Sequence, residues 1–159
     1  MKVERKSQKK SKRTIPEGFH TVTPFLNVND ARGLIEFMQK ALNGEVTSMM
    51  KMDDGKVMHA TVQIGNSPIM VADLMPGMNE PSPATLYLYV DDVDEMYHQA
   101  IDAKGTSIRE PVDEFYGDRS AGVKDKWNNS WWFATHIEDV SDAELERRKE
   151  KFLHENRSN

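Results

Sequence analysis

The sequence predicts an α+β protein made of two βαβββ modules, which together form a curved mixed sheet with a concave cleft. Two observations carry this prediction. A strand-like run, a helical run and further strand-like runs follow one another twice along the chain. Three landmarks also recur at offsets of 62, 61 and 63 positions, namely Asp30 and Asp92, Gly44 and Gly105, and Asn66 and Asn129. A nearly constant offset of this kind indicates an internal repeat.

The first module is predicted to span residues 18–74. Residues 19–28 are rich in β-branched and aromatic side chains and predict a strand, with Pro24 at an edge because it has no N–H to donate. A helix then begins at Asn29 or Asp30 and ends at Gly44. Three further strands are predicted over 46–52, 56–64 and 69–73, with turns at 53–55 and 65–67.

The second module is predicted to span residues 84–140, after a proline-rich linker over 75–83. A strand over 85–90 precedes a helix that Asp91 or Asp92 caps and Gly105 closes. Strands are predicted over 106–108, 117–123 and 130–136. Ser141 and Glu144 form a capping box that opens a charged C-terminal helix, within a last segment of residues 141–159.

Charge is distributed unevenly along the chain. Residues 1–14 carry seven basic residues against one acidic residue, a net charge of +6, which leaves −11 on the remainder of a chain whose net charge is −5. We expect residues 1–16 to form a disordered basic tail. The acidic remainder argues against nucleic-acid binding as the main function. The chain has no cysteine and no apolar run of about 18 residues, so we expect a cytoplasmic protein without a membrane span.

Several stretches carry a resemblance to a known family. They are residues 19–26, 59–60, 69–73, 88–94, 115–119 and 131–136, with Phe115-Tyr116-Gly117-Asp118-Arg119 and Trp131-Trp132-Phe133-Ala134-Thr135-His136 as the most specific. Together they resemble the vicinal-oxygen-chelate (glyoxalase/bleomycin-resistance/dioxygenase) superfamily, and its PhnB-like branch in particular. The resemblance implies a glyoxalase-like fold and a small-molecule ligand. It also implies a homodimer, often with exchanged modules.

Members of this superfamily typically hold a divalent metal with His or Glu side chains from four strands. The resemblance places those positions at Thr23, Thr85, Trp132, and Ala72 or Asp73. Threonine is a poor ligand and tryptophan is none, so we predict no metal site and no cofactor. The sequence also departs from the family before its last strand. The usual Asp-Pro-x-Gly-Asn turn reads Asp125-Lys126-Trp127-Asn128-Asn129, in which Asn128 has to adopt the conformation that glycine serves.

Two histidine hypotheses remain open at this stage. His59 and Asp73 would meet across a hairpin if their side chains share a face, and such a pair suits general base chemistry. The alternative for His59 is a hydrogen-bonded side chain in a half-buried strand. His20, His98 and His136 have no partner that the sequence identifies, so we expect them at the surface or at strand ends.

The remaining candidates are aromatic or charged. Trp131 and Trp132 are adjacent in a strand and must point to opposite faces, so one should line the cleft while the other packs beneath a helix. An aromatic cleft wall favours stacking or cation–π contact with a planar or cationic ligand. Arg119 either holds a ligand carboxylate or phosphate or pairs with Asp118. The predicted ligand-binding set is Thr23, Thr85, Tyr87, Tyr116, Asp118, Arg119, Trp131 and Trp132.

Three functions are compatible with these patterns. The preferred one is a small-molecule-binding protein without the usual metal site. The second is a glyoxalase-type lyase or isomerase that binds a divalent metal through unorthodox ligands. The third is an interaction module that acts through the basic tail and the C-terminal helix.

Overall fold

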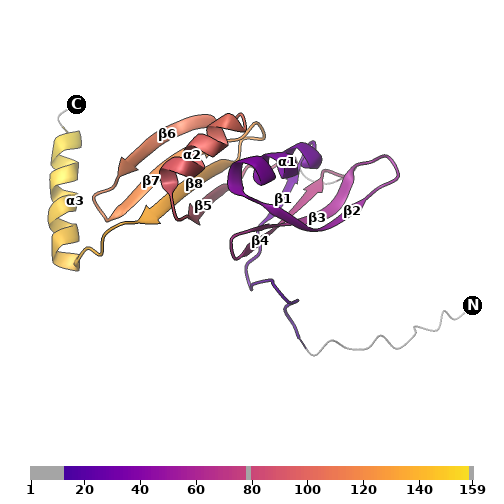
Figure 1. Ribbon diagram of the computed structural model, residues 1–159, viewed down its shortest axis with the longest axis horizontal. Coiled ribbons are helices and arrows are strands. Elements are labelled where there is room, and N and C mark those ends of the chain that lie inside the picture. The colour runs from indigo at the N-terminus through magenta and orange to yellow at the C-terminus, as the bar shows by residue number, and fades with distance from the viewer. Residues whose placement is uncertain (1–12, 78–79, 158–159) are drawn as a thin grey trace, which may run out of the picture.

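A computed structural model describes residues 13–77 and 80–157 of the chain. Most of the predicted basic tail, residues 1–12, lies outside the described residues, as do residues 78–79 of the linker. Figure 1 shows two βαβββ modules side by side with a separate C-terminal helix at one end. The predicted α+β architecture of two repeated modules is confirmed.

Each module forms a four-stranded mixed sheet with one helix. The first consists of β1 (Phe25–Val28), α1 (Ala31–Leu42), β2 (Glu45–Lys51), β3 (Val57–Ile64) and β4 (Ser67–Asp73). The second consists of β5 (Thr85–Tyr89), α2 (Val93–Asp102), β6 (Thr106–Asp113), β7 (Asp118–Lys124) and β8 (Ser130–His136). The strand orders β1-β4-β3-β2 and β5-β8-β7-β6 are equivalent, and the first and last strand of each module run parallel. The two sheets do not close on one another.

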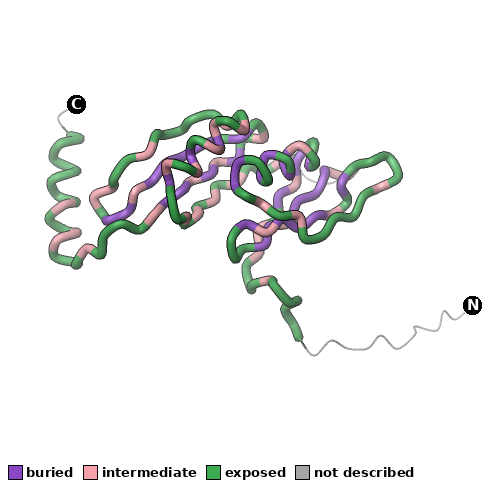
Figure 2. The backbone as a smooth tube through the Cα atoms, viewed as in Figure 1, coloured by how far each residue is buried: buried purple, intermediate pink, exposed green. Residues whose placement is uncertain are grey.

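The two helices pack against each other between the sheets (Figure 1). Their apolar faces join the sheet side chains in one core that crosses the module boundary, with Leu34, Met38, Trp131 and Phe133 fully buried. Figure 2 shows the buried segments running through both modules. The boundary is also tied by Trp127, whose Nε1 donates to the backbone oxygen of Asn29 at 2.7 Å. The two modules therefore share one continuous core.

Local sequence signals explain how the helices begin and end. Asp30 and Asp92 cap α1 and α2 by accepting from backbone amides three residues later. Gly44 does not end α1 as expected, because Asn43 takes the left-handed conformation with φ of 53°. Gly44 is needed for a different reason, since a Cβ there would approach the backbone oxygen of Met38 to 2.9 Å. Asn128 is also left-handed, with φ of 67°, so the altered turn keeps its shape.

Two strands differ in length from their predictions. β1 begins at Phe25 instead of residue 19, and Pro24 lies just before it at the sheet edge. β6 extends to Asp113, well beyond the predicted end at residue 108. Pro111 and the charged residues around it are not typical of a strand, so the sequence predicted an earlier end. An edge strand tolerates both, because its outer side needs no ladder hydrogen bonds.

The C-terminal helix α3 (Asp142–Asn156) is capped by Ser141, as the capping box predicts. None of its residues is buried, and Phe152 and Leu153 each remain 45% exposed. The helix is held by charge and by one aromatic contact. Arg148 pairs with Glu138 and Glu144, and the rings of Phe115 and Phe152 lie 5.0 Å apart. Across residues 13–77 and 80–157, no helix has the length and apolarity needed to cross a membrane.

Candidate functional site

Each sheet has one face covered by its helix and one face that is not, which we call its open face. In β8, Trp131 and Phe133 are fully buried on the covered face, so the alternating Trp132 and Ala134 belong to the open face. This confirms that the two adjacent tryptophans point to opposite faces. Cross-strand register then defines the row Arg109, Gly122, Trp132 and Tyr87 across all four strands of the second sheet.

The indole of Trp132 lies across the open face over Gly122. A Cβ at Gly122 would come within 2.9 Å of the Trp132 ring, so only glycine leaves room for the indole there. The guanidinium of Arg109 stands over that ring, 5.0 Å from its centroid. Arg109 also donates to the carboxylate of Glu114 and to the hydroxyl of Ser120. The exposed surface of Trp132 is therefore already partly covered by a cation from its own chain.

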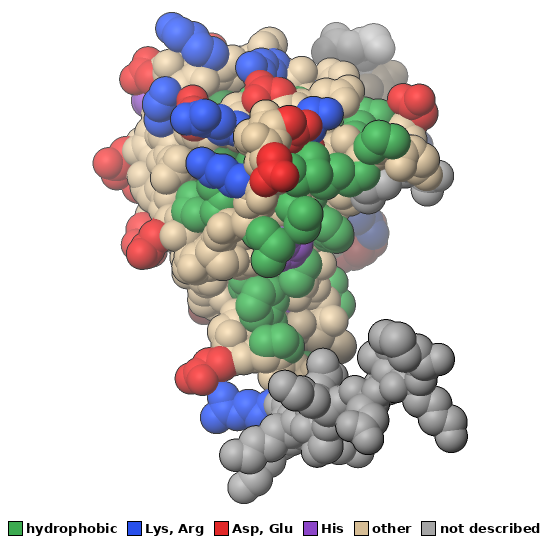
Figure 3. Space-filling view, turned by 90° about the vertical axis from the view of Figure 1, so that its right-hand side faces the viewer, with side chains coloured by type: hydrophobic (Ala, Val, Ile, Leu, Met, Phe, Trp, Pro, Cys, Tyr) green, Lys and Arg blue, Asp and Glu red, His purple; other side chains and the backbone are tan. Residues whose placement is uncertain are grey.

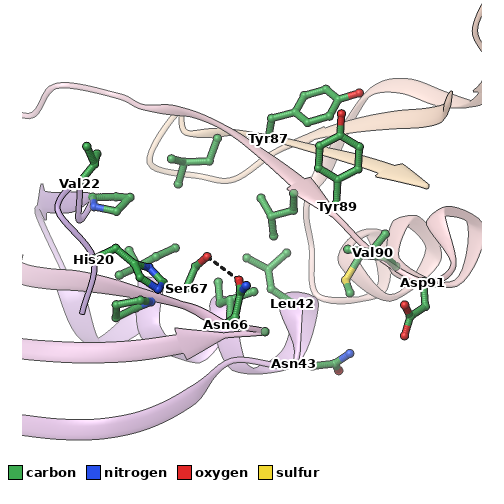
Figure 4. Close-up of a pocket in the computed structure, with 18 residues that line it drawn as sticks. His20, Val22, Leu42, Asn43, Asn66, Ser67, Tyr87, Tyr89, Val90 and Asp91 are labelled. Atoms are coloured by element: carbon green, nitrogen blue, oxygen red, sulfur yellow. Dashed lines mark hydrogen bonds between the residues drawn. The ribbon is translucent and has the colours of Figure 1, made fainter. Parts of the chain in front are cut away.

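Three tyrosines gather at the β5 side of the same face. Tyr87 and Tyr89 project together from β5, away from Leu42 (Figure 4), and their ring centroids are 5.5 Å apart. Burial raises the pKa of Tyr87, and a hydrogen bond to Tyr116 together with the charge of Asp118 raises it further. The charge of Asp118 is also the main reason why the pKa of Tyr89 is raised. All three rings are 38% to 71% exposed.

A hydrogen-bonded chain of ionisable groups runs beside the tyrosines. The hydroxyl of Tyr89 donates to Asp118 Oδ2 at 3.4 Å, and Asp118 Oδ1 lies 2.8 Å from His136 Nδ1. The other ring nitrogen of His136, Nε2, lies 2.8 Å from Asp139. These hydrogen bonds, first to Asp139 and then to Asp118, raise the pKa of His136 and favour the imidazolium form. The expectation that His136 has no partner is therefore wrong.

The turn between β6 and β7 positions this chain. Glu114 N donates to the backbone oxygen of Asp118, and Gly117 N donates to that of Glu114. Gly117 has a φ of 99°, and a Cβ there would collide with the backbone oxygen of Glu138. Only glycine fits this close approach, and the turn places Tyr116 and Asp118 on the open face.

Arg119 is placed differently from its neighbour Asp118. It lies on the covered face, where its guanidinium makes two hydrogen bonds to Asp94 in α2 and one to Asp113. The predicted ion pair with Asp118 is not the one that forms, because adjacent strand residues point to opposite faces. Arg119 thus links α2 to β6 and is directed away from the aromatic face.

The predicted meeting of His59 and Asp73 is wrong. Asp73 is buried beside α1, where its carboxylate accepts from Ala31 N at 2.9 Å and from Val57 N at 2.7 Å. It is a structural anchor for α1 and β3. His59 lies on the open face, with its ring 5.8 Å from that of Phe25. His59 is half-buried in β3, which is the strand position that the alternative prediction gave it.

The positions that the resemblance assigns to a metal do not suit one. The hydroxyl of Thr23 donates to the backbone oxygen of His20, and Thr85 is an exposed first residue of β5. Trp132 offers only its ring, and Asp73 is already bonded to two amides. In the part of the chain that the structure describes, no three His, Asp or Glu side chains are grouped so as to hold a metal ion.

The open face of the first sheet has a different character. Phe25, Met50 and Met58 are 45% to 59% exposed there or at its margin, and Figure 3 shows apolar side chains gathered in a band at this end of the molecule. Phe25 pairs with Met70, and Met50 pairs with His59. The side-chain oxygen of Asn27 is buried without a hydrogen-bond partner among the described residues. This face therefore exposes apolar side chains beside polar ones such as His59, and it carries one buried oxygen atom that has no hydrogen-bond partner among the described residues.

A groove of about 860 Å³ separates the two modules along the free edge of β5. Figure 4 shows it between Val22 and His20 on one side and Val90 and Asp91 on the other. Its lining is largely apolar and includes Leu42, Ile69, Leu86 and Leu88. Within residues 13–77 and 80–157, β1 and β5 are both sheet edges, with no strand paired to their outer sides.

Comparison with known proteins places the fold in a family. The profile of the Glyoxalase/Bleomycin resistance protein/Dioxygenase superfamily matches residues 18–133. The chain belongs to this superfamily. An uncharacterized protein from Mycobacterium bovis, Mb0911c, is 29% identical over an alignment of 135 positions, which covers 79% of this chain and 89% of that protein.

Two solved structures share the fold of this chain. TioX from Micromonospora sp. ML1 has a TM-score of 0.61 at 17% identity, covering 73% of this chain and 99% of its own. The putative 3-demethylubiquinone-9 3-methyltransferase, PhnB protein, from Bacillus cereus has a TM-score of 0.53 at 18% identity, covering 73% and 99%. At these identities the likeness concerns the fold alone.

The structure brings only part of the predicted ligand-binding set together. Tyr87, Tyr116, Asp118 and Trp132 come together on the open face of the second sheet, whereas Trp131 is core and Thr23 lies before β1. Sequence reasoning did not identify Arg109 or Tyr89 as members of this face. It also did not find the partners of His136. The alternation of Tyr87 and Tyr89 in one strand was a usable signal for Tyr89. The position of Arg109 depended on the extension of β6, which the sequence did not indicate.

Proposed function

We propose that this protein binds a small molecule on the open face of the second sheet, without the superfamily's usual metal centre. The observation that carries the proposal is the continuous aromatic row on that face. Tyr87, Tyr89 and Tyr116 present ring surface next to Trp132, beside polar groups that are already hydrogen-bonded to one another. Preformed sites that combine aromatic walls with a few fixed polar groups are typical of ligand recognition.

A second copy of the chain completes the cleft in this proposal. The described residues of one chain leave both open faces uncovered, and the first sheet exposes Phe25, Met50 and Met58. The unpartnered Asn27 oxygen on that sheet also gains from a hydrogen-bond donor outside the chain. We therefore expect a homodimer whose apolar and aromatic faces enclose the ligand together. Light scattering on the purified chain should give twice the chain mass, and a monomeric mass would contradict this arrangement.

Ligand-observed NMR with a library of small aromatic compounds tests the binding function. Binders should lose affinity in Tyr87→Ala and Tyr89→Leu but keep it in the control Arg32→Ala, an exposed change on α1. Binding should be the same before and after treatment with a chelator. Stoichiometric divalent metal in the purified protein, with binding abolished by the chelator, would contradict the proposal.

Catalysis is a second candidate, supported by one observation. The chain Tyr89–Asp118–His136–Asp139 links a hydroxyl on the open face to an exposed carboxylate, which is an arrangement that can move a proton. In this case the protein would be a lyase or isomerase of the superfamily type. A bound compound that is converted by the native chain, but not by His136→Gln, would favour catalysis over binding alone.

A further inference from the structure

We infer that the ligand of the second sheet is an organic cation, seated against the rings of Tyr87, Tyr89 and Tyr116 beside the carboxylate of Asp118, which accepts from the Tyr89 hydroxyl. This rests on the proposed function, because it names the class of ligand for the same face. The sequence alone leaves planar and cationic ligands equally open. Three features of the face decide between them.

The first feature is which ring surfaces remain available. Arg109 already stands over Trp132, so the largest flat surface of the face is occupied by a guanidinium from the chain itself. The open rings are instead the tyrosines, with Tyr89 at 71% and Tyr87 at 47% exposure. The planes of Tyr87 and Tyr89 are inclined at 64°, so they cannot stack on the two sides of a flat ligand. Inclined rings suit a compact cation better than a planar one.

The second feature is the charge beside the rings. Asp118 has 7% of its side chain exposed and is bonded to Tyr89 and His136. His136 is shared between Asp118 and Asp139, so the group keeps one negative charge in excess even when the imidazole is protonated. The charge of Arg109 is compensated separately by Glu114. The rings therefore lie beside a local excess of negative charge.

The third feature is the response of the tyrosines to that charge. Asp118 contributes to the raised pKa of both Tyr87 and Tyr89, because its negative field opposes formation of a phenolate. The same field opposes any anionic ligand and favours a cationic one. Near the tyrosines, the described basic side chains are not placed to hold an anion. Arg109 is paired, Arg119 lies on the covered face, and Lys124 stands at the end of β7 opposite to Asp118.

The experiment compares three probes of similar size on the full chain, by titration followed with protein-observed NMR. They are phenyltrimethylammonium, its neutral isostere tert-butylbenzene and the anion benzenesulfonate. We expect the cation to bind about tenfold more tightly than the neutral isostere, and the anion more weakly than either. Asp118→Asn should weaken the cation about tenfold and change the affinity for the neutral isostere less than twofold.

A second pair of variants covers the case in which Asp118→Asn does not fold. Tyr89→Phe keeps the ring and should keep most of the affinity for the cation, whereas Tyr89→Leu should lose it. Equal affinity for the cation and the neutral isostere, or no loss in Asp118→Asn and Tyr89→Leu, would overturn the inference but leave a binding protein. If none of the three probes nor any library compound binds this face, the inference and the proposed function both fail.

Discussion

The two modules share one backbone fold but carry different side chains at equivalent positions. Phe25 pairs with Met70 on the open face of the first sheet, and 62 positions later Tyr87 pairs with Trp132 on the second. Asn27 and Tyr89 are related by the same offset. The covered faces are alike, since both bury aliphatic or aromatic side chains under a capped helix. The repeat thus sets the fold in both modules, while the polar aromatic site belongs to only one.

Each module is anchored by a buried carboxylate, and removing it should give the largest effect on stability. Asp125 accepts from Trp127 N, Asn129 N, Asn129 Nδ2 and Trp131 Nε1. Asp125→Ala should lower the free energy of unfolding by about 3 kcal/mol or more, because several buried donors lose their acceptor. Asp73→Ala should cost about 2 kcal/mol, since two amides lose theirs.

Urea unfolding measures both values, with the exposed turn change Asp54→Ala as the control. A loss in Asp125→Ala no larger than in this control would show that the second module does not depend on its carboxylate.

Replacing Tyr89 by the residue at the equivalent position of the first module should remove much of the difference in ligand binding between the modules. Tyr89→Asn takes away one ring and the hydroxyl that bonds to Asp118, so affinity for phenyltrimethylammonium should fall about tenfold. NMR titration measures this loss. The reciprocal change, Asn27→Tyr, should create no binding on the first sheet, because Asp73, the buried carboxylate described in that module, is directed to backbone amides on the covered face. Tight binding by the reciprocal variant would contradict the importance of Asp118.

Gly122→Ala should displace the Trp132 indole and lower the free energy of unfolding by a moderate amount. The added methyl group would push the indole from its place, which should cost about 1 kcal/mol and separate the ring from Arg109. Tryptophan emission should shift, since Trp132 moves into a new environment. An unchanged spectrum and unchanged stability would mean that the indole does not rest on Gly122.

The pH dependence of stability should reveal the His136 cluster. The folded-state pKa of His136 lies above its ordinary value of 6.5, so its stabilising contribution is complete below pH 6.5 and is lost as pH rises through the raised pKa. Urea unfolding of the native chain should therefore show stability falling across this window. His136→Gln should flatten that dependence, whereas the control His20→Gln should retain it. A native profile that does not fall in this window would rule out the bonded imidazolium.

Arg119→Ala should have the smallest effect on binding. Its guanidinium is held by Asp94 and Asp113 on the covered face, so affinity for phenyltrimethylammonium should change less than twofold. Titration of this variant beside Asp118→Asn compares two adjacent residues on opposite faces. Equal losses in the two variants would contradict their assignment to different faces.

The fold could be predicted from the sequence because its determinants are local. Capping aspartates, turn residues and alternating apolar positions each act within a few residues, and the repeat let one module support the interpretation of the other. Even where a detail differed, as with Asn43 replacing Gly44 at the helix end, the element itself remained in place.

The site was only partly predictable because it depends on register between distant strands. Asp73 and Asp118 look equivalent as acidic residues at strand positions, but one bonds to backbone amides under α1 and the other supports Tyr89 and His136. Arg109 reaches Trp132 only because β6 continues past Pro111 in an edge position. Which face a side chain occupies follows from these pairings, which no local pattern specifies.

Mapping of phenyltrimethylammonium binding onto the amide resonances of the labelled full chain tests most directly whether the ligand site belongs to the second module. The open-face site predicts shifts concentrated in β5, in β8 and in the turn from Glu114 to Gly117. Shifts confined to β1–β4, or to residues such as Leu42 and Ile69 that line the groove between the modules, would contradict it.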